Sequence, residues 1–343
     1  MSNNRLTRNN PPTIADVARR AGCSISTVSR VFNGSAPVTD DKAIKVRLAI
    51  TQLGYSPQTA ARNLASQRTN TLGLMLPGIG GDFLSLLLSG VEQAANEAGY
   101  DLLISTPRRS RSELQHQSAL GRHNTDGMLV LGEHDTAELT RLCASGFPLV
   151  LLYRSAPNTL RIPSVTIENK SGACQAVDHL IEVHGLTQIG FLRGPQGSED
   201  SHWRARGYRE SLESHGLSYD PDLVANCEFT EIAAMNAVDR WIQQGRLPQA
   251  IFAGSDEAAR GAYTALNQAG IRIPQQVALV GFDDVPMARF LNPPLTTVRT
   301  PADQVGRIAV QQLVRLIQTG EAELQTQLPT ELVVRASCGC HFS

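Results

Sequence analysis

The hydrophobic pattern of residues 13–33 predicts two short helices joined by a tight turn. In the first helix, apolar residues recur at the i, i+3, i+4, i+7 spacing that places them on one face. These residues are Ile14, Val17, Ala18 and Ala21. Thr13 stands at the N-cap with Asp16 three residues later, as in a capping box, and Gly22 suits a left-handed helix end. Ser24 is then placed to cap the second helix.

The predicted second helix has an apolar face, with Val28 and Phe32, and a small, polar and basic face. The polar face consists of Ser26, Ser29, Arg30 and Asn33. It offers hydrogen-bonding groups and no acid, which suits the major groove of DNA. We therefore expect a helix-turn-helix in which Ile25, Ser26 and Arg30 read bases. The alternative is a helical hairpin that only packs against a core.

A third helix is predicted from Thr39, as its cap, to Gly54, as its stop. The residues with helical spacing toward the first two helices are Val46, Ala49, Ile50 and Leu53. Pro57 ends this unit, because the residue before a proline avoids helical angles. The following segment, 59–67, has good helix formers but is too short to be stable alone. We expect a linker that folds only when something holds it.

From residue 71 onward, apolar runs alternate with amphipathic stretches, the pattern of parallel sheets flanked by helices. The candidate strands are 72–76, 101–105, 128–131, 149–152, 189–192, 250–252 and 277–281. The candidate helices are 84–98, 111–122, 136–145, 171–184, 203–215, 231–244, 256–269 and 303–318. This alternation predicts an α/β body of two doubly wound lobes.

Charged and aromatic residues follow several of these strands. They are Asp82, Phe83, Tyr153, Arg154, Arg204, Ser255, Asp256 and Asp283. Because ligands of open parallel sheets bind beyond the carboxyl ends of the strands, we expect these side chains to converge on one cleft. Carboxylates and guanidinium groups exchange paired hydrogen bonds with sugar hydroxyls, and a flat ring covers the apolar face of a sugar. For each acid or arginine, the alternative is an interlobe salt bridge or a helix cap.

Composition and charge narrow the class of protein. At 343 residues, with 41% hydrophobic and 18% charged residues, the chain is long enough for two or three globular domains. It has no apolar run of membrane-spanning length, and residues 1–12 lack the apolar segment of a secretory signal. We expect a disordered tail there, a cytoplasmic protein and no membrane partner.

Charge is divided unevenly along the chain. The first 69 residues carry ten Lys and Arg and three acids, a net charge of +7, which leaves −8 for the remainder. A basic head on an acidic body concentrates the affinity for phosphates at one end and discourages the body from lying on DNA.

Six cysteines are scattered without metal-ligand spacing, apart from the terminal run Cys338-Gly-Cys340-His341. Three potential ligands in four residues can bind a metal or oxidise. The sequence shows no second cluster that would complete a tetrahedral site. We therefore expect buried thiols, no bound metal and no cofactor.

Residues 13–33 read T-I-A-D-V-A-R-R-A-G-C-S-I-S-T-V-S-R-V-F-N, which resembles the DNA-binding signature of the LacI/GalR family of bacterial repressors. By this resemblance, Ile25 and Ser26 occupy the base-reading pair that varies within the family. The residues that would hold phosphates and the base-reading arginine are Thr27, Ser29 and Asn33. The full set expected to contact DNA is Thr13, Ser24, Ile25, Ser26, Thr27, Ser29, Arg30, Asn33, Tyr55 and Leu64.

The linker resembles the hinge helix of the same family, in which two copies from a dimer pair in the minor groove and a leucine wedges between base pairs. Leu64 occupies that position. A wedge offsets the cost of unstacking by bending the DNA and gaining contact. The alternative is a flexible tether whose Leu64 packs on the body.

The resemblance continues through the body and implies a clamshell like that of periplasmic binding proteins, crossed three times by the chain. One lobe would take residues 71–166 and 300–328, and the other 167–299 and 329–340, with residues 295–301 matching the third crossover. The expected domains are a tail (1–12), a helix-turn-helix DNA-binding domain (13–57), a hinge (58–70) and an effector-binding and dimerisation domain (71–343).

By the same resemblance, Arg204 and Asp283 match the effector contacts of the family. Phe83, Phe229 and Asp256 also match, whereas Tyr153 stands where many members carry aspartate. The expected effector-binding set is Asp82, Phe83, Tyr153, Arg204, Phe229, Asp256 and Asp283.

Together these features predict a homodimeric transcriptional repressor, not an enzyme, that binds a palindromic operator in double-stranded DNA and responds to a sugar or sugar derivative. A nucleobase or a sugar phosphate is the alternative effector. The missing signal and the DNA-binding head disfavour a transport-type sugar-binding protein. An NAD-dependent enzyme is disfavoured because Phe83 replaces the third glycine of a dinucleotide fingerprint. No long heptad segment follows the last strand, so we expect a dimer rather than a coiled-coil tetramer.

Overall fold

The computed structural model describes residues 12–33, 36–55, 68–106, 120–132 and 136–340. The chain divides into two compact units, a head of residues 1–69 and a body of residues 70–343. Several predicted features lie outside the described residues, namely the tail, the hinge segment with Leu64, most of the candidate helix at 111–122, and His341. The described end of that candidate helix, residues 120–122, forms a bend and the start of a turn, so the prediction of helix there was wrong.

The described part of the head contains three helices, α1 (Ile14–Ala21), α2 (Ile25–Asn33) and α3 (Asp40–Leu53). A capping box begins α1, because Thr13 N donates to Asp16 Oδ2 at 2.9 Å and Asp16 N donates to Thr13 Oγ1 at 3.3 Å. Gly22 ends it at φ 63°, in the left-handed region that a side chain would strain. Ser24 Oγ then accepts from Thr27 N at 3.2 Å and caps α2.

A small apolar core holds the three helices of the head together. Its buried members are Val17, Ala18, Val28, Val46 and Ala49. Ile50 and Leu53 pack against it from α3, as their spacing predicts. Thr39 departs from the prediction, since it stands at the N-cap of α3 but its side chain makes no capping hydrogen bond. Asp40 and Asp41 in the first turn instead complement the positive end of the helix dipole.

The first sheet of the body is fully parallel, with the strand order β11-β5-β4-β3-β1-β2. Its strands are β1 (Thr71–Met75), β2 (Asp101–Ser105), β3 (Gly127–Leu131), β4 (Leu149–Leu152), β5 (Ser164–Ile167) and β11 (Gln325–Leu328). The helices in the described residues of this lobe are α5 (Asp82–Glu97), α6 (Thr136–Ala144) and α11 (Ala302–Thr319). The central strands β3 and β4 are buried along their whole length, which explains their continuous apolar sequences.

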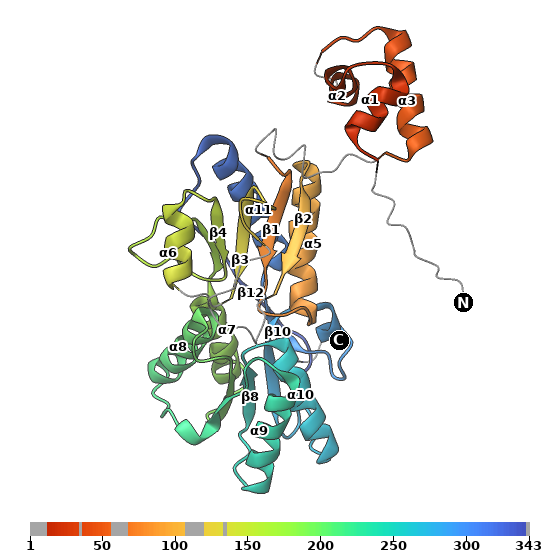
Figure 1. Cartoon of the computed structure of the whole chain (residues 1–343). Helices are drawn as coiled ribbons and strands as arrows, with labels where there is room; N and C mark the ends of the chain where they lie inside the picture. Colours follow the sequence, from red (N-terminus) through yellow and green to blue (C-terminus); the bar gives the residue numbers. More distant parts are fainter. Residues whose placement is uncertain (1–11, 34–35, 56–67, 107–119, 133–135, 341–343) are drawn as a thin grey trace, which may run out of the picture. The chain divides into compact units, whose positions relative to one another are not determined.

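The second sheet has the order β12-β10-β9-β8-β6-β7 and is parallel except for the β10–β12 pair. Its strands are β6 (Ile189–Arg193), β7 (Val224–Asn226), β8 (Ala250–Ala253), β9 (Ala278–Asp283), β10 (Thr296–Arg299) and β12 (Glu331–Val333). Its α-helices are α7 (Asn169–Glu182), α8 (Glu199–Ser214), α9 (Glu231–Gln243) and α10 (Asp256–Gln268), and its 3-10 turns are η2 (Pro221–Leu223) and η3 (Pro286–Arg289). In Figure 1 the α7–α8 pair and the α9–α10 pair flank this sheet from opposite sides.

The chain passes between the two sheets three times within the body. It leaves the first sheet after β5, returns after β10 to form α11 and β11, and crosses again to add β12. The expected fold class, a helix-turn-helix head with a two-lobed α/β body, is confirmed. Every helix in the described ranges is too short or too polar to span a lipid bilayer.

Candidate functional site

A cavity of about 380 Å³ lies between the lobes, at the carboxyl ends of the parallel strands. We call it the interlobe cavity. One lobe contributes the loop after β1 and the start of α5, and the other contributes α8, α10 and the loops after β7 and β9. Its lining residues are Gly80, Gly81, Asp82, Phe83, Leu84, Asp200, Arg204, Phe229, Ser255, Glu257, Arg260, Asp283, Val285 and Met287. This volume falls in the range of small-molecule sites.

Arg204 on α8 is the most firmly held cation of the cavity, with 3% of its surface exposed. Its Nε donates to Asn169 Oδ1 at 2.8 Å, and its Nη1 donates to the carbonyl of Gly254 at 2.6 Å. The guanidinium carbon also lies 3.8 Å from the ring centre of Phe282. These contacts fix the guanidinium before any ligand arrives, which lowers the entropic cost of binding.

Two carboxyls face this guanidinium. Asp283 Oδ1 lies 3.5 Å from Arg204 Nη1 in an ion pair, and Asp200 sits one helical turn before the arginine on α8. Burial raises the pKa of Asp283 to about 7, although Arg204 opposes the shift. Burial also raises the pKa of Asp200 to about 6, while Arg204 and a 2.7 Å hydrogen bond from Asn169 oppose it. Near neutral pH each carboxyl can therefore accept or donate a hydrogen bond.

Aromatic side chains complete the cavity wall. Phe83 lines the cavity, and the ring of Tyr153 meets it edge-on at 5.1 Å between ring centres. Tyr153 is not among the lining residues, but its hydroxyl is buried and has no hydrogen-bond partner within the described part of the chain. A buried, unpaired hydroxyl is costly unless a further group satisfies it.

Three residues of the expected effector set have strained backbones. Tyr153, Phe229 and Asp283 adopt φ values of 55°, 59° and 118°, in the region that L-residues other than glycine rarely occupy. Each such residue costs on the order of 1–3 kcal/mol, and such strain gathers at ligand sites. The surrounding fold therefore imposes these positions at a cost to stability.

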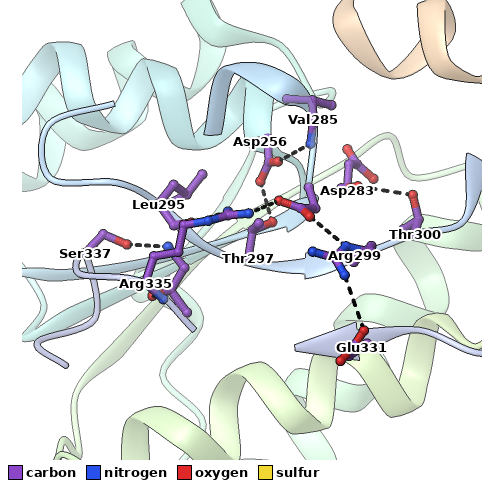
Figure 2. A network of polar contacts seen from close by, with 12 residues as sticks. Asp256, Asp283, Val285, Leu295, Thr297, Arg299, Thr300, Glu331, Arg335 and Ser337 are labelled. Atoms are coloured by element: carbon purple, nitrogen blue, oxygen red, sulfur yellow. Dashed lines mark hydrogen bonds and ion pairs between the residues drawn. The ribbon is translucent and has the colours of Figure 1, made fainter. Parts of the chain in front are cut away.

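Asp256, a predicted effector contact, is not among the lining residues of the cavity. It is fully buried, and its carboxylate accepts hydrogen bonds from Thr297 Oγ1 at 2.6 Å and from Val285 N at 2.9 Å (Figure 2). Burial raises its pKa well above the usual range. Its role is to hold the loop of Val285, a lining residue, against β10.

Asp284, which directly follows Asp283 at the end of β9, forms ion pairs with arginines from other parts of the body. Arg299 Nε donates to its Oδ2 at 2.8 Å, and Arg335 donates to its Oδ1. Arg299 also pairs with Glu331 at 3.5 Å (Figure 2). Because Arg299 ends β10 and Glu331 begins β12, this network clamps two crossings between the lobes.

The predicted base-reading residues share one exposed face of the head. Ile25 is 50% exposed, and Ser26 and Arg30 are also exposed at α2. Ser24 Oγ lies within hydrogen-bonding distance of the hydroxyls of Ser26 and Thr27, at 2.8 and 2.9 Å. The remaining predicted residues lie elsewhere: Thr13 caps α1, Tyr55 packs beside the head core, Ser29 is half-buried on α2, and the Asn33 side chain and Leu64 are not described.

The comparisons with known proteins agree with both halves of this architecture. Residues 13–58 match bacterial regulatory proteins of the lacI family, and residues 177–338 match a periplasmic binding protein-like domain. Over 329 residues the chain is 32% identical to the ribose operon repressor of Escherichia coli (strain K12), covering 95% of this chain and 99% of that protein.

Two solved structures extend the likeness. The transcriptional regulator CelR–cellobiose complex is 32% identical, with a TM-score of 0.70, over 95% of this chain and 99% of that chain. The lac repressor dimer bound to operator and the anti-inducer ONPF has a TM-score of 0.82 at 24% identity, over 96% and 99%, and shares the fold. The chain belongs to the LacI family of bacterial regulatory proteins. It is a DNA-binding transcriptional regulator and not an enzyme.

Some lining residues of this LacI family member were not among the expected effector contacts. They are Asp200, Glu257, Arg260 and Met287, whereas Ser255 was expected at the cleft although not in the effector-binding set. The spacing of Asp200 to Arg204 is one helical turn, so a helical reading of α8 would have placed the two groups together. Ser255 follows a predicted strand, but its hydroxyl accepts from Ala258 N at 3.1 Å and caps α10. For Met287, which follows β9 in a 3-10 turn, no sequence signal was available.

Proposed function

We propose that this LacI family regulator is a repressor whose operator affinity is set by a sugar or sugar derivative bound in the interlobe cavity. The arrangement of one fixed guanidinium between two carboxyls carries the proposal. Arg204 would donate to sugar oxygens, while Asp200 and Asp283 would accept from or donate to hydroxyls. The ring of Phe83 would cover the apolar face of the sugar.

The charges of the cavity favour a neutral ligand over a sugar phosphate. Its charged lining residues are Asp82, Asp200, Glu257, Asp283, Arg204 and Arg260. Both arginines already face acids, since Arg204 pairs with Asp283 and Arg260 pairs with Glu231 at 2.7 Å. A phosphate would therefore meet more negative than positive groups, which costs binding energy. The CelR relative was solved with cellobiose, a neutral sugar.

The remaining expected contacts belong to the same proposal. Asp82 and Phe229 line the cavity, and Tyr153 would satisfy its buried hydroxyl through a ligand hydroxyl. Asp256 does not line the cavity and stays a contact predicted from the family resemblance alone.

On the DNA side, we propose that two heads of a homodimer read a palindromic operator. Ile25, Ser26 and Arg30 offer an exposed reading face, and the positive charge of the head suits phosphate contact. Leu64, in the hinge 58–70, would wedge between base pairs and link the head at 13–57 to the body at 71–343. The lac repressor structure, a dimer on its operator, supports this assembly. Since operator DNA is the target, the protein would act in the cytoplasm.

A ligand screen and a DNA-binding assay test the proposal together. A thermal-shift screen of neutral sugars, sugar phosphates and nucleobases should yield a neutral sugar, which at a hundred times its dissociation constant stabilises the protein by about 2.7 kcal/mol. Fluorescence anisotropy on an operator selected from a genomic library should then change when that sugar is added. If the protein bound DNA weakly and without sequence preference in the presence of every ligand, the proposed control of operator affinity would be refuted. If only sugar phosphates stabilised the protein, the proposal of a neutral sugar as the effector would be refuted.

A further inference from the structure

The second lobe carries a cluster of sulfur and imidazole groups that takes no part in the interlobe cavity. It consists of His179, His184, Cys338 and Cys340, and we call it the Cys–His cluster. His179 lies in the last turn of α7 and His184 lies two residues beyond that helix, whereas both cysteines come from the C-terminal segment after β12. Their four ligand atoms all lie within 4.8 Å of one another.

Three sulfur–nitrogen distances within the Cys–His cluster match those of a tetrahedral metal site. With Zn–S and Zn–N bonds of about 2.3 and 2.05 Å, a tetrahedral angle separates sulfur from nitrogen by about 3.6 Å. Cys338 Sγ lies 3.4 Å from His179 Nε2, and Cys340 Sγ lies 3.7 Å from the same nitrogen. Cys340 Sγ lies 3.5 Å from His184 Nε2. All three separations agree with the expected value to within 0.2 Å.

The backbone of the C-terminal segment brings the two thiols to the same side. Gly339, between them, adopts φ 111°, which a residue with a side chain rarely does. A Cβ at this position would also approach the His184 ring to 3.2 Å. Cys338 is held further by Thr296 Oγ1 at 3.2 Å. The cluster is therefore assembled by the fold rather than by two mobile cysteines.

We propose that the Cys–His cluster binds one Zn²⁺ ion through two thiolates and two imidazoles. Four protein ligands with two sulfurs and two nitrogens favour zinc over the oxygen-preferring Mg²⁺ and Ca²⁺. Because all four positions are filled by the protein, the site is structural rather than catalytic. The sequence expectation of no metal did not consider these four residues together, because the histidines lie more than 150 residues before the cysteines.

A metal at this place would fix the C-terminal segment to α7. The same segment carries Ser337, whose hydroxyl donates to the carbonyl of Leu279 at 2.6 Å, and Arg335, which donates to Asp284. Zinc would therefore stabilise the segment that supplies Arg335, one of the two arginines bound to Asp284. Removing the ion should lower the stability of the body, because binding energy at a structural site is folding energy.

Metal analysis of the full-length protein, purified without a histidine tag, tests the site. After equilibration with a small excess of Zn²⁺ under reducing conditions and gel filtration, the wild type should retain one zinc per chain. Cys340→Ser and His184→Gln should each weaken binding by more than the roughly 10- to 100-fold lost with an outer-shell partner. Cys174→Ser, a half-buried thiol on α7, and His215→Gln are the matched controls and should retain the metal.

Two further measurements distinguish a zinc site from a cluster of unmetallated thiols and imidazoles or a disulfide. Co²⁺ in place of Zn²⁺ should give the visible bands of a tetrahedral site and sulfur-to-metal charge transfer in the wild type and the controls only. Saturating zinc should raise Tm by about 5 °C in the same proteins. The proposal would be overturned if the wild type retained no stoichiometric zinc, or if the control variants lost as much zinc as the ligand variants. It would also be overturned if mass spectrometry found a Cys338–Cys340 disulfide and the reduced protein took up no zinc.

Discussion

Replacing Arg204 by methionine tests the centre of the proposed effector site, because it removes the guanidinium and keeps most of the stem. The change deletes the hydrogen bonds to Asn169 and Gly254 and the ion pair with Asp283. A charge-assisted hydrogen bond contributes about 1.5–3 kcal/mol, so the loss of one such bond to a ligand weakens affinity by about 10- to 150-fold. We expect the effector to lose at least this much affinity.

The same substitution has a cost in stability that can be bounded. Removing one partner of a buried ion pair costs about 3–5 kcal/mol when the other stays charged. Burial already raises the pKa of Asp283 to about 7, so this carboxyl can take up a proton near neutral pH and the loss should fall near the lower figure. About 3 kcal/mol corresponds to roughly 6–12 °C in Tm.

The assay must separate a lost ligand contact from a loosened fold. Isothermal titration calorimetry with the sugar found in the screen, and anisotropy with operator DNA, should be run on Arg204→Met, Asp200→Asn and Arg206→Met at a temperature well below each Tm. Arg206 is a matched control, since it lies on the same helix, half-exposed, and pairs with Glu210 at 2.6 Å. We expect Arg206→Met to behave as the wild type and Arg204→Met to bind operator without responding to the sugar. A responsive Arg204→Met protein, with affinity within twofold of the wild type, would refute the reasoning.

Three further outcomes are expected. Arg30→Ala should weaken operator binding by about 1–3 kcal/mol and relax the base preference at one position in anisotropy titrations, whereas equal losses on operator and random DNA would contradict base reading. Asp256→Ala should lower Tm, because two buried donors lose their acceptor at about 1–3 kcal/mol each; lost sugar binding at unchanged Tm would instead favour a direct contact with the sugar. The raised pKa of Asp283 means that the folded state holds a proton that the unfolded state releases, so stability falls as pH rises from about 4 to 7. Asp283→Asn should reduce this fall in urea denaturation, and an unchanged slope would exclude Asp283 as its source.

Elements defined by local chemistry were predictable from the sequence. The capping box at Thr13 and the left-handed stop at Gly22 fixed both ends of α1, because these interactions span a few residues. The central strands β3, β4 and β8 are apolar throughout since both of their faces are buried. By contrast, β5 and β11 mix polar and apolar residues, and they exist because they pair with each other across the fold. Such pairing leaves no local signal.

The residues of the candidate site likewise fall into those that local sequence predicted and those that depend on distant partners. Residues that follow parallel strands were expected to converge, and Asp82, Phe83 and Asp283 do line one cavity. Asp256 also follows a strand, but its carboxylate turns inward to Thr297, which depends on a partner 41 residues away. The Cys–His cluster escaped prediction for the same physical reason, because its two halves meet only in three dimensions.

The turn at the end of β9 explains how a ligand in the cavity would act on the crossings. Asp283 faces Arg204 and the cavity, while Asp284, the next residue, binds Arg299 and Arg335, and both aspartates have positive φ. A ligand that touches Phe83 in one lobe and Arg204 in the other gains both contacts only at one lobe separation, which gives it different affinities for two states. Reversing a 1:99 equilibrium needs about 5.5 kcal/mol of such difference. Two charge-assisted hydrogen bonds of about 1.5–3 kcal/mol each, made in one state only, supply most or all of it.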